Sequence, residues 1–130
     1  MNAEFYSIVE MIHEKDPRYK ADAYAFVMEA LSYTQKKFKA PRHVTGQQML
    51  EGMKEFLLDQ YGPLALTVLE YWGIKNTEDF GNIIFHLVAN QILSKTEDDN
   101  FETFRQGYDF NEVFRIGYRK QLAKKISRMC

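Results

Sequence analysis

The stretch NTEDFGNIIFHLVANQILSKTEDDNFETFRQGYDF, residues 76–110, decides the expected fold. Behind a cap at Asn76 or Thr77, apolar residues recur at helical spacing up to about Gln91. Residues 93–104 then place two short runs on either side of a polar turn, which predicts a two-stranded β-hairpin. A helix and a hairpin that follow another helix and a glycine turn predict a winged-helix-like element over about residues 63–110.

The sequence ahead of this element predicts further helices. Apolar residues at i, i+3, i+4 and i+7 indicate a first helix that ends before Asp16 and a second over residues 20–38. Thr45 and Gln48 have the spacing of a capping box, which indicates the start of a third helix. We therefore expect a helical N-terminal part over about residues 3–61.

Glycine and proline predict where the later helices end and begin. Gly62 closes the third helix, and Pro63 suits the first position of a fourth helix that ends at Gly73. Asp109 precedes a last, basic helix over about residues 110–127. The expected fold class is mainly α: a single domain of five to six helices with a short β-hairpin.

Composition agrees with one soluble domain. Of 130 residues, 45% are hydrophobic and 15% aromatic, which is ample material for one core. The single cysteine, Cys130, permits no disulfide within the chain. The start lacks a signal-peptide pattern, and no apolar run approaches the ~20 residues that span a bilayer. We expect a cytoplasmic protein with no membrane span.

No pattern in the sequence indicates catalysis. No serine lies in a G-x-S-x-G elbow, and His13, His43 and His86 lie in separate segments without metal-ligand spacing. The acidic run that begins at Glu97 lacks the glycine and the closing glutamate of a calcium loop. We expect no catalytic residue, cofactor or metal, and a histidine such as His86 is more often structural than titrating.

The winged-helix outline favours nucleic-acid binding, but its charge does not. The candidate recognition helix carries Glu78 and Asp79, and no Lys or Arg lies between Asn76 and Leu93. The expected hairpin tip is acidic and would repel a phosphate backbone. Winged helices also serve as protein-contact modules, so the shape does not require DNA.

The net charge of −1 hides an uneven distribution. Six basic residues and no acidic residue lie from Arg115 onward, which leaves 11 basic against 18 acidic residues before it, a balance of −7. Such a basic helix suits nucleic acid, an anionic surface or an acidic protein, although cations also simply complement a helix C-terminus. Candidate nucleic-acid or anionic-surface contacts are Lys36, Lys37, Lys39, Arg42, Arg115, Arg119, Lys120, Lys124 and Lys125.

Aromatic residues support a third interpretation, protein contact. Tyrosine and tryptophan are enriched at interfaces, although core packing accounts for most of them. Candidate protein-contact residues are Tyr71, Trp72, Asn82 and His86. The leading hypothesis is a non-catalytic protein-interaction or regulatory module that binds a protein partner or self-associates. A nucleic-acid-binding regulator using the basic C-terminal helix is second, and an enzyme with an unrecognised site is third.

Three segments carry a family resemblance: RHVTGQ, WGIKNTEDFG and KTEDD. With the surrounding sequence over about residues 16–110, the chain resembles a bacterial family of conserved hypothetical proteins of the planctomycete and verrucomicrobium type. That family has no assigned activity, cofactor or catalytic residue. The resemblance therefore implies a bacterial cytoplasmic protein and adds no site residue.

Overall fold

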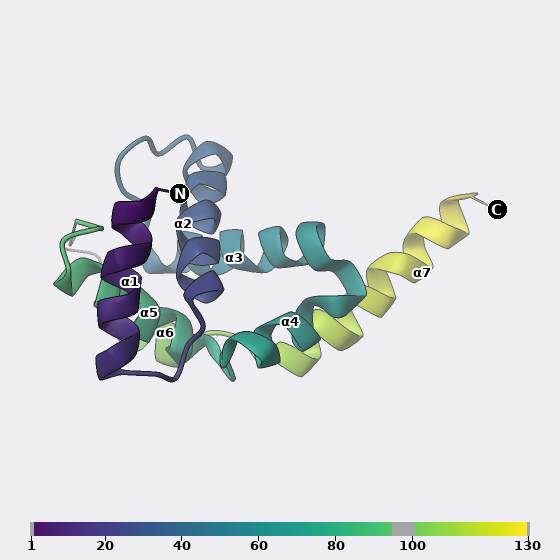
Figure 1. Ribbon diagram of the computed structural model, residues 1–130. Helices are drawn as coiled ribbons and strands as arrows, with labels where there is room; N and C mark the ends of the chain where they lie inside the picture. The colour runs from purple at the N-terminus through teal and green to yellow at the C-terminus, as the bar shows by residue number, and fades with distance from the viewer. Residues whose placement is uncertain (1, 95–100, 130) are drawn as a thin grey trace.

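The computed structural model describes residues 2–94 and 101–129, and these residues form helices joined by short loops. The helices have the bounds α1 (Ala3–Lys15), α2 (Ala21–Lys37), α3 (Gly46–Tyr61), the 3-10 turn η1 (Gly62–Leu64), α4 (Ala65–Trp72), α5 (Thr77–Ala89), α6 (Phe101–Arg105), the π-helix η2 (Asn111–Gly117) and α7 (Tyr118–Met129). Helices α1 to α6 pack together, whereas α7 extends away from them (Figure 1).

Local side-chain chemistry fixes several helix starts, as the sequence predicts. Thr45 accepts a hydrogen bond from the Gln48 backbone N–H at 3.1 Å, and the Gln48 side chain accepts from the Thr45 N–H at 2.9 Å. Asn76 and Asp79 form the same reciprocal pair at the start of α5. These capping boxes satisfy backbone donors that have no partner within the helix.

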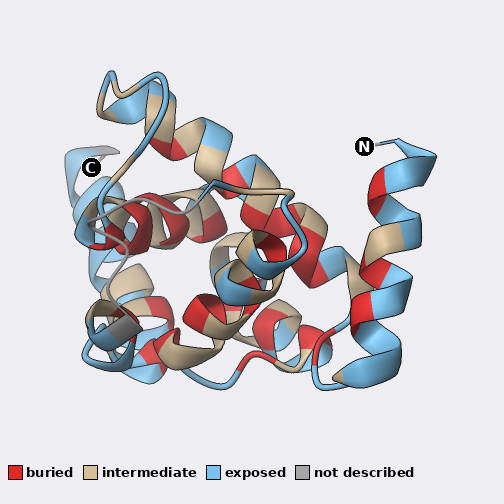
Figure 2. Ribbon diagram, turned by 90° about the vertical axis from the view of Figure 1, so that its left-hand side faces the viewer, coloured by how far each residue is buried: buried red, intermediate tan, exposed pale blue. Residues whose placement is uncertain are grey.

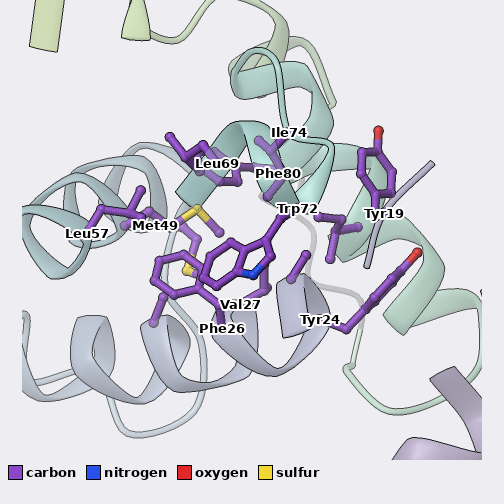
Figure 3. Close-up of a cluster of buried hydrophobic side chains, with 14 of the residues drawn as sticks. Tyr19, Tyr24, Phe26, Val27, Met49, Leu57, Leu69, Trp72, Ile74 and Phe80 are labelled. Atoms are coloured by element: carbon purple, nitrogen blue, oxygen red, sulfur yellow. The ribbon is translucent and has the colours of Figure 1, made fainter. Parts of the chain in front are cut away.

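The core lies between α2, α3, α4 and α5. Trp72 lies beside Phe26 and Val27 at its centre (Figure 3), and Figure 2 shows the buried residues of these helices on the stretches of ribbon that face the interior. Helices α2 and α3 approach closely because Gly52 has no side chain: a Cβ atom there would lie 1.8 Å from Thr34 Oγ1. The buried Thr34 hydroxyl has its own hydrogen-bond partner, because it donates to the Ala30 carbonyl within α2.

Gly73 ends α4 in the left-handed conformation (φ +86°), as the sequence predicts. A Cβ atom here would lie 2.1 Å from the Arg18 carbonyl oxygen, so only glycine permits this approach. The Lys20 N–H donates to the Trp72 carbonyl at 3.1 Å. Gly73 thereby lets the α1–α2 loop pack against the end of α4.

The predicted β-hairpin and winged-helix element are wrong. No strand is present in residues 2–94 and 101–129, and residues 101–105 form the short helix α6. The expected turn at residues 97–100 lies outside the described residues. Helix α6 is held against α5 by a hydrogen bond from the Thr77 hydroxyl to the Phe104 carbonyl, and Phe104 is buried.

The C-terminal segment leaves the core through a π-helix. The Asp109 carboxylate accepts from the Glu112 N–H at 2.9 Å, and Phe110 and Phe114 pack near Phe80 in the core. A π-helix bonds each N–H to the carbonyl five residues back, which makes its turn wider than an α-helical turn. Helix α7 continues this segment and runs past the end of α3 (Figure 1).

Candidate interaction surface

One row of apolar side chains runs along η2 and α7 at a spacing of four residues: Phe114, Tyr118, Leu122 and Ile126. Phe114 is 2% exposed and Tyr118 is partly buried, whereas Leu122 is 43% and Ile126 is 53% exposed. The row begins in the protein's own core and continues beyond it. We call Tyr118, Leu122 and Ile126 the apolar ridge.

Glycine permits the contact at which the ridge leaves the body. Gly62 adopts φ +49° and presents bare backbone to Tyr118, whose hydroxyl oxygen would lie 3.6 Å from a Cβ atom at this position. Leu64, two residues further, is 59% exposed. The ridge therefore starts against the backbone of Gly62 and then extends into solvent.

Basic side chains surround the ridge. Within the part of the chain that the structure describes, none of these cations has an ion-pair partner, which distinguishes α7 from the ion-paired surface of α2 and α3. At 100° per residue, one charged row faces directly away from the ridge and two cations flank it. The row consists of Lys120, Lys124 and Arg128, the flanking residues are Arg119 and Lys125, and Arg115 lies in η2.

The second predicted basic group lies elsewhere in the fold. Lys36 and Lys37 are in the last turn of α2, and Lys39 and Arg42 follow in the loop to α3. Lys37 donates to Glu55 at 2.7 Å, and this bond raises the pKa of Lys37. Because the end of α2 and α7 occupy separate parts of the molecule, the two groups do not form one basic surface (Figure 1).

Tyr71 and Trp72 are adjacent in sequence but differ in environment. Tyr71 is 67% exposed, and Lys20 Nζ lies 5.5 Å from the centre of its ring. Trp72 is 6% exposed and packs in the core against Phe26. Of the pair, Tyr71 is available to a partner.

Asn82 belongs to a polar cluster between α5 and the start of α2. Its amide donates to the Tyr19 hydroxyl at 3.0 Å, and that hydroxyl donates to Asp79. Burial and the bond to Asp79 raise the pKa of Tyr19. Asp79 also accepts from the Lys75 N–H at 2.7 Å, so one carboxylate links the cap of α5 to the α1–α2 loop.

His86 occupies a second cluster, one turn further along α5. Its Nδ1 lies 2.8 Å from the Tyr24 hydroxyl and its Nε2 lies 3.3 Å from an Asp16 carboxylate oxygen. The Tyr24 hydroxyl can donate to Nδ1 when the proton is on Nε2, facing Asp16. Burial lowers the pKa of His86, against the opposing effect of Asp16, and burial raises the pKa of Tyr24 to about 12.

Arg18 completes this cluster. It donates to Asp16 from Nε and Nη2 at 2.8 and 2.6 Å, and these bonds lower the pKa of the Asp16 carboxyl to about 2. The sequence did not identify Asp16, Arg18 and Tyr24 as members of a polar cluster. Nothing in the sequence near these residues indicates that they meet His86 of α5 in the fold. Tyr24 is fully buried, so the cluster fastens the α1–α2 loop and presents no accessible nucleophile.

A cleft of about 240 Å³ lies between α2, α5, the start of α3 and the preceding loop. Apolar side chains make up much of its lining, which also includes Arg42 and His43. Among its described lining residues there is no Asp or Glu that could pair with His43 as acid or base. The geometry around His43 gives no support to an enzyme site.

Within residues 2–94 and 101–129, no group of three His, Cys, Asp or Glu side chains is arranged to hold a metal ion. No helix in the same part of the chain has the length and apolar character needed to cross a bilayer. Comparison of the chain with protein-family models, curated proteins and solved structures gives no match.

Proposed function

We propose that the protein is a non-catalytic protein-interaction or regulatory module and that α7 is its contact element. The observation that carries the proposal is the apolar ridge, whose row begins at buried Phe114 and ends at Ile126, 53% exposed. A row that packs on the core at one end and continues at the same spacing favours burial along its whole length. The exposed end is the part left for a partner.

The length of α7 supports the same proposal. Helix α7 has 12 residues. Isolated helices of this length, below roughly 12–15 residues, are only marginally stable in water. Most helical stability in proteins comes from packing of an apolar face. Leu122 and Ile126 supply such a face, so a bound partner would stabilise α7.

The chemistry of the ridge defines the partner. Aliphatic side chains spaced by one turn fit an apolar groove, as amphipathic helices do in other helix-in-groove complexes. Flanking cations at Arg119 and Lys125 favour acidic residues at the edges of that groove. We therefore propose an acidic protein surface with an apolar centre.

The test replaces the ridge without changing charge. Leu122→Gln with Ile126→Gln keeps good helix formers and should abolish capture of partner protein from a lysate of the source organism. Gln121→Ala with Ser127→Ala changes two residues of the same helix outside the ridge and should leave capture intact. Equal capture by both variants would exclude α7 as the contact element.

The unpaired cations favour nucleic-acid binding as a second candidate function. Lys120, Lys124 and Arg128 form a continuous basic row on the face opposite the ridge. A protein that uses this row should bind a DNA or RNA fragment with a strong dependence on salt. Changing all three to Gln should reduce the slope of log affinity against log salt by roughly two to three.

The two candidates separate on the same helix. The Leu122→Gln, Ile126→Gln variant retains every cation, so it should keep nucleic-acid binding and lose protein capture. A wild-type protein that binds no DNA or RNA at low salt would exclude the second candidate. Fluorescence anisotropy over a salt series measures both the affinity and the slope.

A further inference from the structure

We infer that the partner of α7 is a second copy of this chain and that α7 docks on the outer face of α1. The inference rests on the proposed function and names the surface that covers the ridge. Helix α1 buries Phe5, Val9 and Ile12 against the body, which leaves its opposite face in solvent. Figure 2 shows this outer face as exposed along the length of the helix.

The outer face of α1 has the composition that the ridge requires. Met11 is 56% exposed, and its unbranched thioether side chain adapts to an irregular apolar surface. Glu4, Glu10 and Glu14 are exposed around it on the same side of the helix. No ion pair joins these carboxylates to any other residue in the described ranges 2–94 and 101–129.

The charges of the two helices are complementary. The chain carries a balance of −7 before Arg115 and +6 from Arg115 onward, so the body of one copy attracts α7 of another. Pairing α7 with α7 would instead bring five cations against five. Complementary charge therefore selects α1 over a second α7 as the docking surface.

The placement of the two helices makes the contact intermolecular. Helices α1 and α7 lie at opposite ends of the molecule in Figure 1, so α7 cannot fold back onto α1 of its own chain. They have similar lengths, 13 and 12 residues, or about 20 and 18 Å at a rise of 1.5 Å per residue.

A two-fold axis between two copies would place each α7 beside the α1 of the other. The α7–α1 contact would then occur twice in one closed dimer, as in other isologous assemblies. A standard stable interface buries ~1,200–2,000 Å², and a single pair of short helices buries less than this. Two such contacts in one dimer double the buried area.

The first test measures the dimer directly. Sedimentation equilibrium of the wild-type protein should show a monomer–dimer equilibrium that weakens as salt is raised. Leu122→Gln with Ile126→Gln should weaken the dimer at least about a hundredfold, because the two substitutions remove buried apolar anchors from both contacts of the dimer. The Gln121→Ala, Ser127→Ala control should dimerise as the wild type does.

The second test reverses charge on each helix separately. Glu10→Lys with Glu14→Lys makes the α1 face basic, and Arg119→Glu with Lys125→Glu makes the borders of the ridge acidic. Each variant alone should be monomeric, because its α1 and α7 then carry charge of the same sign. An equal mixture should form a heterodimer, because both contacts between the two variants become complementary.

Several outcomes would overturn the inference. These are a monomeric wild type, a dimer that survives loss of the ridge, and a mixture that forms no heterodimer when thermal unfolding shows both variants folded. Ridge-dependent recruitment to anionic vesicles by a monomeric protein would also overturn it. If the protein is monomeric but ridge-dependent capture from the lysate persists, the inference fails and the proposed function stands.

Discussion

At the scale of single residues, the best-defined chemistry lies where the α1–α2 loop meets α5. Asp16, Tyr24 and His86 lie in one hydrogen-bonded chain. In this chain neutral His86 accepts a hydrogen bond from Tyr24, whose side chain is fully buried. Protonation would remove this acceptor, because both ring nitrogens then carry hydrogen. The position of the loop is therefore linked to the protonation state of His86.

This linkage predicts a pH dependence of stability. Burial holds the pKa of His86 below its ordinary value of 6.5, so the unfolded chain binds the proton more readily. The free energy of unfolding should fall as pH is lowered through 6.5 and further below it. A second loss should follow between about pH 4 and 2, where Asp16, with a pKa of about 2, becomes protonated.

Chemical denaturation at a series of pH values measures this dependence. His86→Gln should remove the loss near and below pH 6.5 and keep the loss at lower pH. His43→Gln removes a histidine that lies outside the cluster and serves as the matched control. Identical pH profiles for the wild type and His86→Gln would contradict the prediction.

At the scale of helices, sequence reasoning predicts the segments whose signals are local. The capping boxes at Thr45 and Asn76 and the left-handed glycine at Gly73 each depend on residues within one turn. The segment FETFR differs, because its two phenylalanines are three residues apart and five residues do not separate helical from strand spacing. In the fold this segment is helical, and its Phe104 carbonyl accepts a hydrogen bond from Thr77, which is 27 residues earlier in the chain. A local pattern in the sequence does not reveal such a contact.

The Thr77 hydroxyl provides a test of how α6 is held. Thr77→Val keeps the shape of the side chain but leaves the Phe104 carbonyl without this donor. The free energy of unfolding should fall by about 1–3 kcal/mol, the cost of a buried unsatisfied group. Thr77→Ser retains the hydroxyl and should lose less than Val does. Urea denaturation of the three proteins measures the difference, and equal losses would show that the hydrogen bond contributes little.

The polar clusters were not predictable at the same scale. Asn82 and His86 are recognisable as polar residues on an apolar helix, but their partners Tyr19 and Tyr24 are about 60 residues earlier in the chain. The sequence alone gives no indication of such pairs. The exposed ridge was only partly predictable. The sequence shows that residues 115–130 are basic and amphipathic, but it does not show whether the body of the protein covers Leu122.

At the scale of the whole molecule, the protein has an acidic body and a basic projecting helix. The lysines and arginines of α7 are exposed, and α7 lies beyond the packed helices (Figure 1). A protease that cuts after basic residues requires locally open backbone, which α7 of the monomer, with its apolar face uncovered, provides more readily than the body. The tail should therefore be the first site of cleavage.

Limited trypsin digestion followed by mass spectrometry checks this expectation. The first cuts should fall at Arg119, Lys120, Lys124 or Lys125. The remaining fragment should keep the thermal unfolding midpoint of the body to within a few degrees, since a loss of about 1 kcal/mol corresponds to roughly 4–8 °C in a small domain. Initial cleavage after Lys15 or Lys37, at the ends of the packed helices α1 and α2, would contradict the prediction.

The π-helix that precedes α7 has a consequence for register. A π-helical turn is equivalent to an α-helix that has gained one residue, and one residue corresponds to about 100° of rotation about the helix axis. In an unbroken α-helix, Leu122 would lie eight residues after Phe114 and about 80° away from it around the axis, because eight steps of 100° exceed two full turns by 80°. The wider turn of the π-helix takes up most of this rotation and keeps Leu122 near the line that Phe114 begins. Deleting a single residue between Phe114 and Tyr118 should restore an α-helix and leave Leu122 within about 20° of that line, so the ridge should keep its direction. The π-helix thus absorbs one residue of the chain without turning the ridge away from the core.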